Sequence, residues 1–193
     1  MQKLSKLKNS FSLSDINFGG LSASVNWVGY FGKKHGFSLS LVDEAVSLFE
    51  GFFGSSNERV VILTALSFDD EREKDKEVIR RYRHIYEKMK SRRLLLPMTN
   101  EYESFRFGEA PLAASSLSLS LDYADFIDLS RLMMCYSGVI GYQCFYIDPS
   151  LSVAIYPHDD VGYGCIALNG NETVCREFLI HCSESDSFKV VLD

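Results

Sequence analysis

The residues with the clearest potential for chemistry are His158, Asp159 and Asp160, which follow one another between Tyr156 and Gly162. Imidazole and carboxylate groups together bind several divalent ions and take part in metal-assisted hydrolysis. Successive residues of an extended chain point to opposite sides, so the three reach one ion only if the chain bends tightly. Proline and aspartate are typical of a turn, in which the Asp side chain accepts hydrogen bonds from nearby backbone. A structural turn is therefore favoured, and a metal-dependent hydrolase using this turn stays an alternative.

Other catalytic signatures are missing from the sequence. It contains no G-x-S-x-G and no phosphate-binding glycine loop, and Gly162-Tyr163-Gly164 lacks the third glycine of G-x-G-x-x-G. The five cysteines include no C-x-x-C pair, and unpaired cysteines suit a reducing cytoplasm. No apolar stretch has the length of a signal peptide or membrane span. We therefore expect a cytoplasmic protein with no catalytic residue, no metal, no cofactor and no membrane contact.

Charge is unevenly distributed along the chain. Residues 71–93 hold ten basic and five acidic side chains, whereas residues 94–193 hold four basic and fourteen acidic ones. An acidic surface repels nucleic acid and speeds encounter with basic partners. Asp122, Asp125 and Asp128 have helical spacing near an expected helix start, where carboxylates are favoured without a partner. The acidic set is larger than capping requires, so we expect a basic protein partner and no direct contact with nucleic acid.

The basic stretch 71–93 offers a second alternative, an RNA-binding adaptor. Its arginines would pair with phosphates, and the interleaved Tyr82 and Tyr86 would stack on bases. Four acidic residues between 71 and 77 are expected on the same helix. A solvated helix with internal ion pairs is therefore favoured.

Hydrophobic spacing and turn residues divide the chain into helices and strands. Ser40 and Asp125 are the expected caps of two helices. Helices and hairpins alternate without βαβ regularity, so the predicted class is α+β. We expect a mainly antiparallel sheet in the C-terminal half, packed against helices near 41–53, 70–93 and 126–136. The chain length fits one domain, 1–193, with 1–20 as a candidate flexible segment. Strands are expected at 22–31, 59–66, 102–107, 117–123, 141–147, 152–156, 161–168 and 188–192, and a further helix at 172–182.

The segment from His158 to Ala167 resembles the hallmark of a bacterial domain family of unknown function, Tyr-Asp-Asp-Arg-Gly-Cys-Asp-Val-Ile-Ala. An Ala-x-x-x-Phe-x-x-x-Phe helix from Ala45, followed by a Glu-Arg-Val-Val-Ile-Leu strand, is also similar to that family. The likeness spans about residues 42–182 and departs from the motif at Val161 and Gly164, which replace its Arg and its last acidic residue. The resemblance implies a fold and no activity.

The general profile is similar to the immunity proteins of bacterial toxin systems, such as contact-dependent growth inhibition. Those proteins are small, cytosolic and acidic, and often have no recognisable catalytic motif. This resemblance of type implies a protein that blocks the active site or substrate cleft of a cognate basic toxin, preferably an RNase or another nuclease. Carboxylates would steer the toxin and tyrosines would anchor it. The oligomeric state is left open. The expected partner-binding residues are Asp159, Asp160, Asp122, Asp125, Tyr123, Tyr156 and Tyr163.

Overall fold

The computed structural model describes residues 16–18, 20–54, 60–71 and 79–193. Two short 3-10 helices, η3 (Leu21–Ala23) and η5 (Ala114–Ser116), accompany the longer elements. The helices are α1 (Leu39–Phe53), α3 (Arg83–Ser91), α4 (Asn100–Arg106), α5 (Tyr123–Ile140) and α6 (Thr173–Ser183). The strands are β1 (Trp27–Lys33), β2 (Val61–Ala65), β3 (Ser67–Phe68), β4 (Leu96–Pro97), β5 (Ser118–Ser120), β6 (Gln143–Asp148), β7 (Val153–His158), β8 (Gly162–Ala167) and β9 (Phe188–Leu192).

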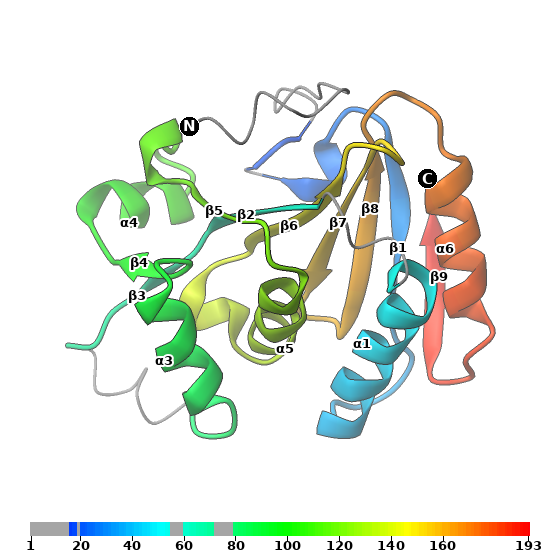
Figure 1. Ribbon diagram of the computed structural model, residues 1–193, viewed down its shortest axis with the longest axis horizontal. Coiled ribbons are helices and arrows are strands. Elements are labelled where there is room, and N and C mark those ends of the chain that lie inside the picture. The colour runs from blue at the N-terminus through cyan, green and yellow to red at the C-terminus, as the bar shows by residue number, and fades with distance from the viewer. Residues whose placement is uncertain (1–15, 19, 55–59, 72–78) are drawn as a thin grey trace.

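Seven of the strands form one sheet in the order β5-β2-β6-β7-β8-β1-β9, and every pairing in it is antiparallel (Figure 1). β3 and β4 form a separate parallel pair. The predicted α+β class, with an antiparallel sheet packed against helices, is confirmed. The meander β6–β7–β8 lies where the sequence predicted it, while β1 and β2 bring the first half of the chain into the same sheet.

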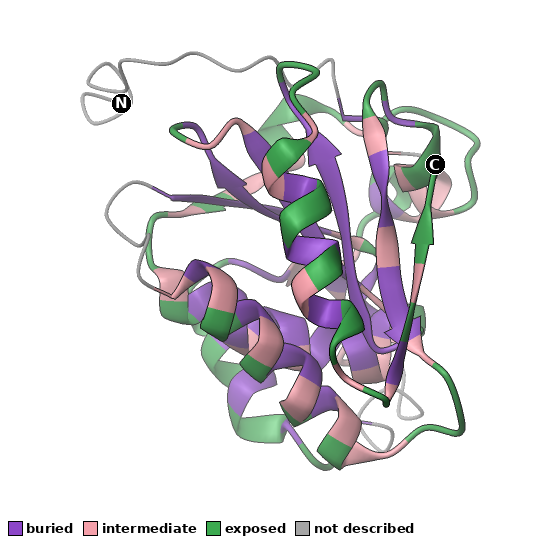
Figure 2. Cartoon of the chain, turned by 90° about the vertical axis from the view of Figure 1, so that its right-hand side faces the viewer, coloured by how far each residue is buried: buried purple, intermediate pink, exposed green. Residues whose placement is uncertain are grey.

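Both faces of the sheet are covered. Helices α1, α5 and α6 lie together on one face, around a core centred on Phe49 (Figure 1). On the other face, Ile16, Phe18 and Trp27 pack against a second apolar cluster that includes Tyr156. Buried positions therefore run along the central strands, while the helices alternate buried and exposed residues (Figure 2). This double cover explains why every residue of β2 is buried, as its continuous apolar run predicted.

Several predicted elements differ from the structure. The helix expected near 70–93 is confined to Arg83–Ser91 in the described residues. Residues 72–78 of the expected helix lie outside the described residues. Phe68 is held in an extended conformation by its pairing with Pro97, and Tyr82, which precedes Arg83, makes no side-chain cap. The strand expected at 102–107 is helix α4, because Thr99 accepts a hydrogen bond from the Tyr102 N–H and caps it.

The observed helix caps and the start of the first strand also differ from the predicted ones. Ser38, and not Ser40, caps α1. Asp122, and not Asp125, caps α5, which starts earlier and ends later than predicted. The strand expected at 22–31 begins only at Trp27, because the preceding residue, Asn26, has a left-handed backbone (φ 60°) that interrupts an extended run.

Candidate functional site

The residues 159–161 form the turn between β7 and β8, and this turn is fastened to β1. Lys33 donates from its backbone N–H to the Asp160 carbonyl oxygen at 2.8 Å, and its Nζ lies 2.9 Å from the Asp160 carboxylate. The imidazole of His158 donates from Nε2 to the carbonyl oxygen of Phe31 at 2.9 Å. The predicted turn is therefore present, and two of its three polar side chains bind β1. Asp159 is exposed, and no ion pair within the described part of the chain involves it.

The turn does not assemble a metal site. His158 and Asp160 are bound to Phe31 and Lys33. Across the described residues, no group of three or more His, Cys, Asp and Glu side chains is placed to hold a metal ion. The metal-dependent hydrolase alternative thus lacks a ligand set in this part of the molecule.

The environment of His158 makes stability depend on pH. Burial lowers the pKa of His158, against the opposing effects of its bond to Phe31 and of the nearby Asp160 and Asp159, while Lys33 lowers it further. The folded protein therefore binds a proton at this site less readily than the unfolded chain, whose histidine pKa is about 6.5. We expect the free energy of unfolding to fall as the pH drops below about 6.5.

This pH dependence is measured by urea denaturation between pH 7.5 and pH 5. The variant His158→Gln keeps a hydrogen-bond donor and cannot titrate, so it should lose the part of the slope that His158 supplies. Equal slopes for the wild type and His158→Gln over this range would show that His158 does not titrate differently on folding.

Gly162 and Gly164 allow close packing of β8. A Cβ atom on Gly164 would lie 2.2 Å from the Tyr156 ring, and one on Gly162 would lie 1.9 Å from the carbonyl oxygen of Phe31. Both glycines sit within a buried, paired strand. Their role is to admit neighbouring atoms rather than to hold a phosphate.

The substitution Gly164→Ala is expected to lower the free energy of unfolding by about 2 kcal/mol, because the added methyl group overpacks the site. A matched control is Gly138→Ala in α5, where an added Cβ meets no atom within 4 Å. That change should leave stability unchanged or raise it by up to ~1 kcal/mol. Urea denaturation of both variants checks the prediction, and wild-type stability for Gly164→Ala would show that the Tyr156 ring yields without cost.

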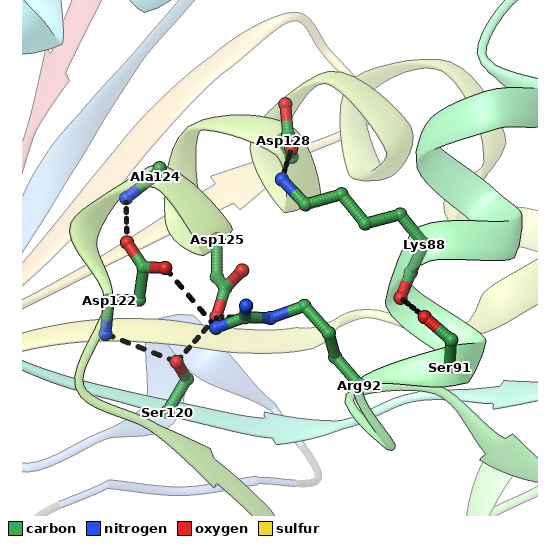
Figure 3. Close-up of polar contacts among 8 residues, drawn as sticks. All are labelled: Lys88, Ser91, Arg92, Ser120, Asp122, Ala124, Asp125 and Asp128. Carbon is green, nitrogen blue, oxygen red and sulfur yellow. Dashed lines mark hydrogen bonds and ion pairs between the residues drawn. The ribbon is translucent and has the colours of Figure 1, made fainter.

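The carboxylates at the start of α5 are occupied by cations from α3 and the residue after it (Figure 3). Arg92 donates to Asp125 at 3.1 and 2.6 Å and lies 3.2 Å from Asp122, which also caps α5 through the Ala124 N–H. Lys88 lies 2.6 Å from Asp128. These ion pairs join α3 to α5. Asp125 is fully buried, so it is unavailable for the partner contact that the sequence analysis expected, and Asp122 is exposed but already paired.

The three predicted anchor tyrosines are mostly core residues. Tyr163 is fully buried beneath α1 and α5, stacked on Phe49. Tyr156 is buried on the opposite face, where its hydroxyl accepts a hydrogen bond from Trp27 Nε1 at 2.7 Å. Tyr123 is half-buried, and its hydroxyl oxygen is enclosed. Direct contact with a partner through Tyr156 or Tyr163 is therefore excluded in this fold.

Helix α3 presents few of the features of an RNA-binding helix. Tyr82 and Tyr86 are buried, so neither ring is available to stack on a base. Lys88 and Arg92 bind α5, and Lys90 lies 2.6 Å from Asp70. Within the described residues these cations pair with other elements, and Lys90 also pairs with Glu87 along the helix; the acidic residues at 73–77 lie outside the described residues.

Two adjoining hollows surround α4. The first, of about 870 Å³, lies between α4 with its following turn, the last turn of α5, Phe18 and Leu21, and the β7–β8 turn at Asp159. The second, of about 450 Å³, extends toward the end of β3. The two meet at Met98 and Glu103, which line both. We call the two hollows together the α4 groove.

The described lining of the α4 groove is acidic. Its one lysine or arginine is Arg106, whose guanidinium donates to the carbonyl oxygens of Val139 and Gly138 at 2.9 and 2.8 Å. Those bonds cap the C-terminal end of α5, where a cation is favoured. Arg106 is therefore held against α5 by two directed bonds. The carboxylates that line the groove are Asp69, Asp70, Glu71, Glu103 and Asp159.

The α4 groove also has exposed aromatic side chains. Phe107 is 73% exposed and Tyr142 is 43% exposed, and both line the first hollow. The sequence analysis did not select either residue, nor Glu103. Thr99 followed by Glu101 and Glu103 was the available signal for α4, since a hydroxyl cap and first-turn acids mark a helix start.

Comparisons with known proteins give no relative for this chain: no family model, curated protein or solved structure matches it. Among the described helices, none combines the length and apolar character needed to cross a bilayer.

Proposed function

We propose that the protein is an immunity protein that binds and neutralises a cognate bacterial toxin in the cytoplasm. The preferred toxin is a nuclease, and an RNase in particular, because such enzymes carry the basic surfaces that an acidic inhibitor complements. The observation that carries the proposal is the α4 groove, which combines acidic side chains with exposed aromatic rings. Aromatic anchors with charged surroundings are typical of protein interfaces.

The cytoplasmic setting is supported by the cysteines. Cys144, Cys165, Cys175 and Cys182 are buried as free thiols, and Cys135 is a free thiol that is half-buried. Burial raises the pKa of Cys135 to about 11, so this thiol stays protonated and unreactive near neutral pH. A protein that keeps five unpaired cysteines suits a reducing compartment.

The test is co-expression with the domain encoded by the adjacent reading frame, where we expect the toxin to be encoded. We expect the chain to restore growth of cells that express the domain, and the purified chain to suppress its nuclease activity at equimolar concentration. An unrelated nuclease domain serves as the specificity control and should keep its activity. Absence of both rescue and complex formation would reject the proposal.

A further inference from the structure

We infer that the toxin docks on the α4 groove and that the groove receives the positively charged substrate cleft of the nuclease. This inference rests on the proposed function and adds the surface and the part of the partner that it contacts. First, the other acidic cluster, at the start of α5, is a poorer docking surface. Asp122, Asp125 and Asp128 hold α3 against α5 through Arg92 and Lys88, so a partner there would have to break bonds that join two helices. In the α4 groove, Asp70 is likewise bound by Lys90, whereas Asp159 makes no ion pair within the described residues.

The second step is the order of the carboxylates along the α4 groove. Asp69 and Glu71 line the hollow near β3, Glu103 lines both hollows, and Asp159 lines the far hollow beside the β7–β8 turn. Negative groups thus come from separate segments of the chain that line two adjoining hollows. A nucleic-acid strand presents its phosphates to a cleft as a similar series of negative charges, which lysine and arginine neutralise. Charge complementarity therefore favours the basic cleft of a nuclease as the occupant.

The third step concerns the aromatic rings. Clefts that bind single-stranded nucleic acid combine backbone-binding cations with surfaces on which bases stack. Phe107 and Tyr142 are exposed in the same hollow as Glu103 and Asp159. The groove thus offers aromatic rings beside carboxylates, as a nucleic acid offers bases beside phosphates. We assign Phe107 as the main anchor, because its side chain is the more exposed of the two.

The experiment measures binding of a catalytically inactive variant of the neighbouring toxin domain by surface plasmon resonance. Phe107→Ala should weaken binding by about 30-fold, as expected for an aromatic anchor. Asp159→Asn should slow association by about fourfold at low salt, with the difference disappearing in high salt. A short non-cleavable RNA oligonucleotide should compete with the wild-type chain for the toxin.

The matched controls lie on α6, outside the described lining of the α4 groove. Ile180 is exposed and apolar, and Glu177 is exposed and acidic, so Ile180→Ala and Glu177→Gln mimic the two groove changes. Both should bind like the wild type. Denaturation curves of all four variants establish that they are folded.

The possible outcomes separate the inference from the proposed function. If the wild type binds and the two groove variants bind equally well, the groove is not the docking surface, while the proposed function stands. If the groove variants weaken binding but the oligonucleotide does not compete, the toxin is held by a surface other than its cleft. If the wild-type chain neither binds nor neutralises the toxin, both proposals fail.

Discussion

Replacing Phe49 with alanine is expected to lower the free energy of unfolding by about 4 kcal/mol, the largest effect that we predict for a single substitution. Phe49 is fully buried in α1 and faces the sheet between α5 and α6. Truncation removes apolar contacts, leaves a cavity and ends several edge-to-face and stacked ring pairs. Rings with centroids 4.9 to 6.2 Å from that of Phe49 belong to Phe53, Tyr123, Phe126, Tyr146, Tyr163 and Phe178.

The measurement is urea denaturation followed by circular dichroism, with Phe37→Ala as the control. Phe37 is the same residue type but is 53% exposed, so its loss should change stability by less than about 0.5 kcal/mol. A typical domain is stable by only about 5–15 kcal/mol, so Phe49→Ala would remove a large share of the total. A loss below about 1 kcal/mol would mean that the surrounding rings collapse into the space, and that the core tolerates repacking.

Burial on both faces of the sheet explains why Tyr156 and Tyr163 are not exposed, as contact with a partner would require. Tyr156 and Tyr163 were selected because they flank the acidic turn, although both lie in strands that are apolar in sequence. Here both faces are covered, the second by residues near Ile16, Phe18 and Trp27. The sequence between residues 1 and 40 indicated a strand at 22–31, but gave no sign that Ile16 and Phe18 cover the face that holds Tyr156. The burial of both tyrosines depends on the cover of the two faces, which their nearness to the acidic turn in sequence does not reveal.

Local sequence patterns were sufficient to predict those elements whose structure depends mainly on their own residues. The hairpins from β6 to β8, the helix α6 and the strand β9 follow from alternation, from Asp-Pro-Ser and Asn-Gly-Asn turns and from helical spacing. Asp148 illustrates this, since its carboxylate accepts hydrogen bonds from the backbone of Ser150 and Leu151. Such bonds involve near neighbours in sequence, and near neighbours can be read from the sequence.

The α4 groove could not be predicted in the same way. It combines Phe18, Glu103, Tyr142 and Asp159, which come from four separate parts of the chain. Only the order of strands in the sheet and the docking of α4 on the end of α5 bring them together. The groove also depends on the helical state of residues 100–106, where a strand at 102–107 was predicted from an imperfect alternation of side chains. Of the expected partner-binding residues, Asp159 alone belongs to the described lining of the groove.

Replacing Arg92 with methionine is expected to lower the free energy of unfolding by about 3 kcal/mol, because it leaves the carboxylate of Asp125 buried without its cation. Asp125 is 0% exposed, and one of its oxygens accepts both bonds from Arg92 and one from Ser120. Its other oxygen has no hydrogen-bond partner, so little else compensates the charge. The expected loss is at the lower end of the range for buried ion pairs that lose one partner. The reason is that the Arg92 side chain is 40% exposed, so water can reach Asp125 when it is removed.

The matched control for this prediction is Arg176→Met. Arg176 pairs with Glu172 on the surface of α6, with both side chains at least 40% exposed, so its loss should cost about 0.5 kcal/mol or less. The double variant Arg92→Met with Asp125→Asn should be more stable than the sum of the two single changes implies, by more than about 1 kcal/mol. Strict additivity, or equal losses for Arg92→Met and Arg176→Met, would contradict the view that Asp125 is a structural carboxylate that requires Arg92.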